Sequence, residues 1–130
     1  MSLVLKERPS NDPLEVRALF ALHRLLGKDG RLWIKHQHSK RQGGEVYRTL
    51  MGAVHSISNQ PQFNKTRMRE SMFNLLYAAL PRHYRNAHVT SYAAACIDFN
   101  DRPATDWIDV ENVIERAIEI GRSRAESNDA

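Results

Sequence analysis

The sequence predicts a mainly α-helical, single-domain protein, a compact bundle of four to five helices with a short extended segment near residues 31–36. Apolar residues recur at intervals of three and four along most of the chain, which is the pattern of amphipathic helices. The 130 residues suffice for one core but not for two. With 42% hydrophobic and 26% charged residues, the composition is that of a globular protein. We expect residues 1–11 and 124–130 to be flexible ends of the domain 1–130.

The first helix is predicted over residues 13–26. Asp12 is placed to cap it, and Pro13 suits the first helical position because proline lacks the N–H group that would be unsatisfied there. Gly27 offers a left-handed stop. After a turn at residues 28–30, the short apolar run 31–35 favours extended chain over helix.

Residues 35–44 contain no apolar side chain and end in the pair Gly43-Gly44, which indicates a polar loop. The second helix is expected directly after it, within residues 45–57. Gly52 lies inside this predicted helix, where glycine is tolerated mainly if another backbone comes close.

A third helix is predicted over residues 65–80, with Asn64 as its cap and Pro81 as its end. Residues 91–97 fit a short buried helix, which we favour over extended chain. Residues 99–103 are expected to form a turn. The closing helix is predicted to begin between Thr105 and Asp109 and to fray after about Arg124.

The charge of the chain is divided along its length. Residues 24–85 carry twelve Lys or Arg against three acids, a net charge of +9, whereas the chain from Asp98 onward has a net charge of −5. This division fits a basic face for an anionic partner, but it equally fits two halves that attract each other in the fold. The sequence leaves both interpretations open.

Several classes of protein are disfavoured by composition. No apolar run approaches the roughly 20 residues that cross a bilayer, and the N-terminus becomes charged too early for a signal peptide, so we expect a cytoplasmic protein without a membrane partner. The single cysteine, Cys96, lies in an apolar stretch and is expected to be a buried, inert thiol. We expect no cofactor.

Basic residues cluster in two segments that we predict to form the binding surface. They are Lys35, His36, His38, Lys40, Arg41, Lys65, Arg67 and Arg69. The leading hypothesis is a non-enzymatic accessory protein that binds a macromolecule through this surface, with a protein as the first choice of partner. Direct DNA or RNA binding through the same surface is the alternative, because flexible cations also contact phosphates. A homodimer is compatible with either hypothesis.

A third hypothesis is a small enzyme or metal protein. His36 and His38 would point to one face of an extended strand, and His55 could add a third imidazole, but the surrounding Lys and Arg oppose cation binding. We therefore assign no metal site and no catalytic residue. Asp101 would be the acid–base group or ligand in this hypothesis.

The pair Asn100-Asp101 supports two interpretations. In the first, both side chains bond nearby backbone N–H groups and fix the entry to the closing segment. In the alternative, Asp101 serves a pocket formed by Phe99, Asn100, Asp101 and Trp107. Local spacing identifies no partner for Asp101.

Short motifs relate the chain to a protein family. They are Gly52-Ala53, Leu80-Pro81, Phe99-Asn100-Asp101, Thr105, Val110 and Ala117. Together they resemble a family of small uncharacterised bacterial and phage helical proteins over roughly residues 14–120. In that family a tryptophan usually stands where this chain has Phe99, and Tyr47 corresponds to a common cysteine or tyrosine. The resemblance implies a compact helical fold and no known activity.

Overall fold

The computed structural model describes residues 5–129, and this part of the chain is mainly helical, as predicted. Its elements are α1 (Leu14–Leu26), the 3₁₀ helix η1 (Lys28–Gly30), β1 (Ser39–Gln42), β2 (Glu45–Arg48), α2 (Leu50–Ser58), α3 (Lys65–Ala79), α4 (Arg82–Ala87), α5 (Tyr92–Asp101) and α6 (Trp107–Asp129). The short helix α4 raises the number of α-helices described to six, one more than the upper bound predicted.

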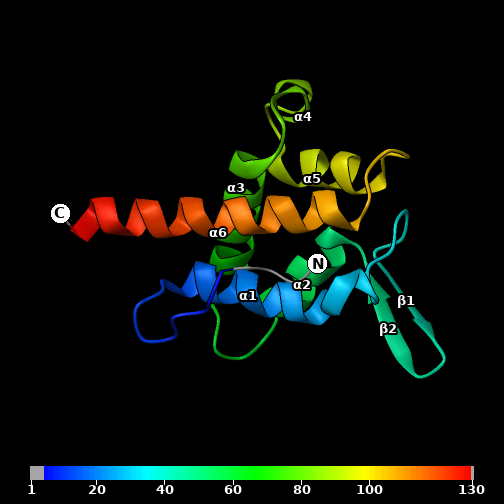
Figure 1. Cartoon of the computed structure of the whole chain (residues 1–130), viewed down its shortest axis with the longest axis horizontal. Helices are drawn as coiled ribbons and strands as arrows, with labels where there is room; N and C mark the ends of the chain where they lie inside the picture. Colours follow the sequence, from blue (N-terminus) through cyan, green and yellow to red (C-terminus); the bar gives the residue numbers. More distant parts are fainter. Residues whose placement is uncertain (1–4, 130) are drawn as a thin grey trace.

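The core lies where α6 crosses α1 and α3 (Figure 1). Leu19, Leu22, Leu76, Ile114 and Ile118 are completely buried there. Each such side chain contributes roughly 1.5–3 kcal/mol when it leaves water, so this crossing is the main source of stability. In Figure 1 the hairpin β1–β2 and the C-terminal end of α6 extend from opposite sides of this helical body.

The start of α1 differs from the prediction. Pro13 occupies the N-cap, and Asp12 does not cap the helix. The Asp12 carboxylate instead accepts hydrogen bonds from the backbone N–H of Arg8 and from the Arg122 guanidinium at 2.8 and 2.9 Å. The bond from Arg122 is the main cause that lowers the pKa of Asp12. Asp12 therefore ties α6 to the beginning of α1. The predicted stop is confirmed, because Gly27 has a φ of 87°.

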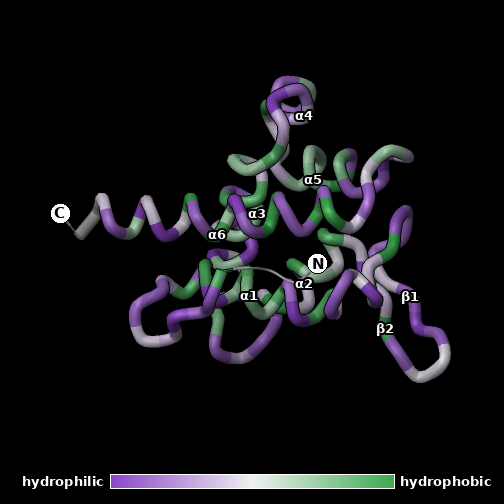
Figure 2. Tube along the Cα trace, in the orientation of Figure 1, coloured by the Kyte–Doolittle hydropathy of each residue, from purple (hydrophilic) through white to green (hydrophobic). Residues whose placement is uncertain are grey.

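The prediction of a loop over residues 35–44 followed directly by a helix is wrong. Residues 39–48 form an antiparallel hairpin in which Gln42 pairs with Glu45 across the Gly43-Gly44 turn. Both glycines have positive φ, 60° and 79°, as the two central residues of a type I′ turn require. Figure 2 shows that β1 is hydrophilic along its length. The sequence lacks the alternation of apolar and polar residues that predicts strands, because neither face of this hairpin is buried.

Helix α2 consequently begins later than predicted. Thr49 is its N-cap, and the hydroxyl of Thr49 accepts a hydrogen bond from the N–H of Gly52 at 3.1 Å. The reason inferred for Gly52 is confirmed: a Cβ atom at this position would lie 1.9 Å from the carbonyl oxygen of His38. The base of the hairpin therefore touches the backbone of α2.

The cap predicted for α3 is confirmed, since the side chain of Asn64 accepts a hydrogen bond from the N–H of Arg67. A helix is also present at the predicted residues 91–97, as the first part of α5, but only Ala95 and Cys96 of this stretch are buried. The turn predicted at 99–103 is wrong in its first half, because residues 99–101 form the last turn of α5. Cys96 is buried on α5, and burial raises the pKa of its thiol to about 12, so the thiol is protonated at neutral pH.

The closing helix begins at Trp107, within the predicted range, and extends to Asp129. Its first turn is stabilised by Asp106 and Asp109, each of which accepts a hydrogen bond from the backbone N–H of the other. Among residues 5–129, no helix has the length and apolar character needed to span a bilayer.

Asp98 on α5 makes stability sensitive to acid. Its carboxylate accepts hydrogen bonds from Arg102 at 2.6 and 3.1 Å and contacts the His88 ring at 2.9 Å. The bond from Arg102 is the main cause that lowers the pKa of Asp98 to about 2. Because the folded pKa is depressed, its contribution to stability is complete above the unfolded value of about 4 and is lost as the pH falls toward 2.

We therefore expect Asp98→Asn to be less stable than the wild type at pH 6 and to approach it at pH 2.5. Urea unfolding at both pH values measures this difference. Glu119→Gln, a change of the same kind at an exposed site on α6, is the control. A deficit of equal size at both pH values would contradict the assigned ion pair.

Candidate partner-binding surface

The two predicted basic segments meet at His55 of α2. The ring of His38, at the base of the hairpin, lies 4.9 Å from the ring of His55 in an edge-to-face arrangement. Burial lowers the pKa of His55, and the neighbouring Arg69, His38 and Lys65 lower it further. His55 and, from α3, Arg69 also line one hollow, and Lys65 lies one turn before Arg69 on the same side of α3.

We define the basic face as the six residues that this meeting brings together. They are His38, Lys40, Arg41, His55, Lys65 and Arg69. Lys40 and Arg41 lie on the exposed strand β1, two and three residues beyond His38. Since a strand rises about 3.3 Å per residue, both cations stay within about 10 Å of the hairpin base along the strand.

Three of the predicted surface residues lie elsewhere. The Lys35 ammonium donates a hydrogen bond to the carbonyl oxygen of Arg102 at 2.6 Å and therefore fastens the segment before β1 to the loop after α5. Arg67 is two residues from both Lys65 and Arg69, so it falls on a different side of α3. The backbone N–H of His36 donates to Asp101, and its ring faces the same carboxylate.

The acidic helix α6 does not neutralise the basic face. Among residues 5–129, the ion pairs involve other groups: Glu111 of α6 binds His23, and Arg31 binds Glu45. Arg69 donates to the uncharged side chains of Ser58 and Asn59 at 3.3 and 3.2 Å. Helix α6 packs farther along α3, where Arg116 reaches the carbonyl oxygen of Ala79. The charges of the basic face are thus left to the solvent or to another molecule.

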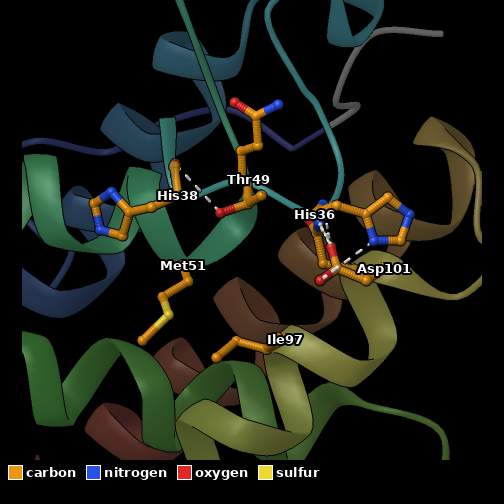
Figure 3. A pocket seen from close by; sticks show the side chains of 8 residues that line it. His36, His38, Thr49, Met51, Ile97 and Asp101 are labelled. Carbon is orange, nitrogen blue, oxygen red and sulfur yellow. Dashed lines mark hydrogen bonds and ion pairs between the residues drawn. The ribbon is translucent and has the colours of Figure 1, made fainter. Parts of the chain in front are cut away.

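Two hollows beside the basic face share the side chain of Met51. The smaller has a volume of about 170 Å³ and is lined by His36, Gln37, His38, Thr49, Met51, Ile97, Asn100 and Asp101. The larger has a volume of about 600 Å³ and is lined by Met51, His55, Thr66, Arg69, Glu70, Phe73, Asn74, Thr90, Ser91, Tyr92 and Ala93. In Figure 3, Met51 and Ile97 point toward one another below the polar residues. We call the two hollows together the groove.

Asn100 holds the elements around the smaller hollow in place. It is 1% exposed, and its side-chain oxygen accepts hydrogen bonds from Trp33 Nε1 at 2.7 Å and from the N–H of Leu50 at 3.0 Å. Its side-chain nitrogen donates to the carbonyl oxygen of Ile34 at 3.1 Å and to Asp101 at 2.9 Å. One amide therefore joins the segment before β1, the start of α2 and the end of α5.

The predicted pocket of Phe99, Asn100, Asp101 and Trp107 is not assembled. Phe99 packs against Tyr84 with ring centroids 5.4 Å apart, and Trp107 lies against Trp33 at 6.2 Å. Asn100 and Asp101 line the smaller hollow without them. The first interpretation of the pair agrees better with the structure, because both side chains accept hydrogen bonds from backbone N–H groups. The donors, however, are Leu50 and His36, which are distant in the sequence.

The histidines do not gather into a metal site. His38 and His55 are in contact, whereas His36 has a φ of 68° and is directed to Asp101, with 3.9 Å between Nδ1 and Oδ2. In the described part of the chain, no three His, Cys, Asp or Glu side chains are grouped so that they could hold a metal ion. The hydroxyl of Thr49, which lines the same hollow as His36 and Asp101, caps α2 and donates to the carbonyl oxygen of His38 at 3.4 Å.

Residues 11–120 match a family of unknown function, DUF6197. The chain belongs to this family. The DUF6197 region extends from the residue before Asp12 into the second half of α6, and it therefore contains the whole basic face and the groove. Membership confirms the predicted relation to an uncharacterised family. No curated protein and no solved structure matches the chain.

The apolar floor of the groove was missed in the sequence. Ala93 and Ile97 are four residues apart on α5 and hence lie on one side of that helix. Tyr92 and Ile97 are 40% and 38% exposed, although the stretch around them reads as buried. The i, i+4 spacing was a usable signal, but the sequence does not show which side of a short helix lacks a covering element.

Proposed function

We propose that the protein is a non-enzymatic binding protein that recognises an acidic partner protein through the basic face. The observation that carries the proposal is the meeting of two separate basic segments at His55 without a carboxylate paired to Lys40, Arg41 or Lys65 among the described residues. Clustered like charges repel one another in the free protein. An acidic surface placed over them relieves this repulsion and speeds association.

The apolar groove favours a protein over a nucleic acid as the partner. Met51, Tyr92 and Ile97 offer partly exposed apolar surface in the groove, and Arg69 lines the larger hollow together with Met51 and Tyr92. Interfaces between proteins combine an apolar centre with a charged rim, whereas affinity for nucleic acids comes mainly from contacts with phosphates. Nucleic-acid binding through the same cations remains the alternative that the experiment must separate.

The test is a comparison of captured proteins. We expect the double variant Lys40→Glu/Arg41→Glu to lose the partner that wild-type protein captures from a nuclease-treated lysate, because reversal places negative charge opposite an acidic surface. Arg17→Glu/Lys28→Glu makes the same charge change at exposed positions elsewhere and should retain the partner. Quantitative mass spectrometry of the three samples measures the difference.

Cross-linking provides the second measurement, because it locates the contact. Carboxyl-to-amine cross-links from the partner should involve Lys40 or Lys65. Capture that is unchanged by the reversal would reject the basic face as the interface. Capture that disappears on nuclease treatment would instead support the nucleic-acid alternative. In that case affinity for DNA should also fall steeply with added salt.

A further inference from the structure

We infer that the groove is the docking site for an acidic segment of the partner that also carries apolar side chains. This inference rests on the proposed function, because it names the site and the chemistry of the same interaction. The groove differs from the basic face in what it offers: a floor of apolar side chains from α2, α3 and α5, with Arg69 in the lining of the larger hollow.

The floor is continuous because Met51 borders both hollows. On one side of Met51, the side chain of Ile97 points toward it (Figure 3). On the other side, Phe73 lies 6.2 Å from His55 in an edge-to-face arrangement, and Ala93 completes the wall on α5. The larger hollow, at about 600 Å³, is within the size range of sites that enclose ligands, so it can accept side chains of a partner.

The charges beside this floor decide which segment fits. Lys65 and Arg69 stand at the α3 end, and Lys40 and Arg41 extend from the hairpin end. The lowered pKa of His55 makes its ring neutral at pH 7, so it acts as a hydrogen-bonding group there. Two carboxylates also border the groove. Asp101 is already bonded to His36 and Asn100, whereas Glu70 is exposed beside Arg69.

Around the groove, the four cations Lys40, Arg41, Lys65 and Arg69 outnumber these two carboxylates, and this surplus favours an acidic segment over a basic one. Apolar side chains of the occupant remove the floor from water, while its Asp or Glu side chains meet the cations at either end. An occupant with only Asp and Glu side chains would leave the apolar floor exposed to water. An occupant with apolar residues alone would leave the cations without partners. The combination of both is the chemistry that the groove matches.

Peptide selection tests the inference even while the identity of the partner is open. A phage library of random 16-residue peptides is selected on the purified full-length protein, and one enriched peptide is synthesised for fluorescence anisotropy. We expect enriched sequences to combine Asp or Glu with Leu, Ile or aromatic residues. Failure to enrich peptides, or enrichment of basic ones, overturns the inference.

Matched variants then locate the peptide. Ile97→Ser should weaken its binding about tenfold, the loss expected when one of the few central residues of an interface is truncated. Ile108→Ser is the control, since this isoleucine is similarly exposed, at 47%, but lies on α6. Ala93→Gln should also weaken binding, because it adds bulk to the floor at a helix position that tolerates glutamine. Circular dichroism confirms that each variant is folded.

The outcomes separate the inference from the proposed function. If Lys40→Glu/Arg41→Glu weakens peptide binding while Ile97→Ser and Ala93→Gln do not, the basic face binds the partner and the groove is rejected. If none of the variants has an effect, both proposals are rejected. Displacement of the peptide by an oligothymidine, or by self-association seen in size-exclusion chromatography, would assign the groove to a nucleic acid or to a second copy and overturn the inference.

Discussion

Asn100→Ala should destabilise the protein by about 4 kcal/mol, because it leaves several buried polar groups without partners at once. The substitution removes the acceptor of Trp33 Nε1 and of the Leu50 N–H, and it removes the donor to the carbonyl oxygen of Ile34. A buried group without its hydrogen bond costs roughly 1–3 kcal/mol, and three such groups are affected here. Urea unfolding measures the loss.

The indole signals identify the cause of this loss. The chain contains two tryptophans, and Nε1 of Trp107 is buried and has no hydrogen-bond partner among residues 5–129. In an NMR spectrum of Asn100→Ala, the Trp33 indole N–H should move and exchange faster, while that of Trp107 should change little. Asn112→Ala, at an exposed position on α6, serves as the control. Wild-type stability together with an unchanged Trp33 signal would show that Asn100 does not join these segments.

Gly52→Ala should destabilise the protein by about 3 kcal/mol, near the upper end of typical overpacking costs. The added Cβ would lie 1.9 Å from the His38 carbonyl oxygen and 3.0 Å from its carbonyl carbon. Both sides of this contact are backbone, so no rotation of a side chain relieves it. The hairpin base is also fixed by the bond from the Thr49 N–H to the same oxygen at 3.3 Å.

Gly121→Ala provides the comparison for Gly52→Ala in urea unfolding. Its added Cβ would lie 2.6 Å from Val16 Cγ2 and 3.2 Å from Leu75 Cδ1, which are side-chain atoms rather than backbone atoms. We therefore expect a smaller loss of stability than at Gly52. A Gly52→Ala protein as stable as the wild type would mean that the hairpin does not rest on α2. In that case the assigned contact between His38 and His55 would also be wrong.

Local sequence patterns predict helix ends correctly where the role of a residue depends only on its near neighbours in the chain. Asn64 was predicted as the cap of α3, and Gly27 as the stop of α1, because each role depends on neighbours within four residues. Gly52 was interpreted as a point of close backbone approach, although the partner, His38, became known only in the fold. The spacing of apolar residues likewise placed the long closing helix at its observed start.

Local sequence patterns mislead where the same residues are compatible with two different structures. Gly43-Gly44 was interpreted as the end of a loop, but two residues with positive φ are also what a tight hairpin needs. Asp12 has the right position for a cap, yet the guanidinium of Arg122, from the far end of the chain, binds it instead. A charge-assisted pair outweighs a neutral cap in energy, and the sequence gives no sign that the two residues will meet.

Helix periodicity and charge are properties of short segments, so the helical fold class, the strongly basic middle and the acidic end follow from the sequence. The neighbours of these charges depend on how the helices pack. Helix α6 packs on the later part of α3 and directs Glu111 to His23, while the hairpin brings His38 to His55. Burial of apolar side chains determines how the helices cross, and this packing in turn determines which charged side chains lie next to one another.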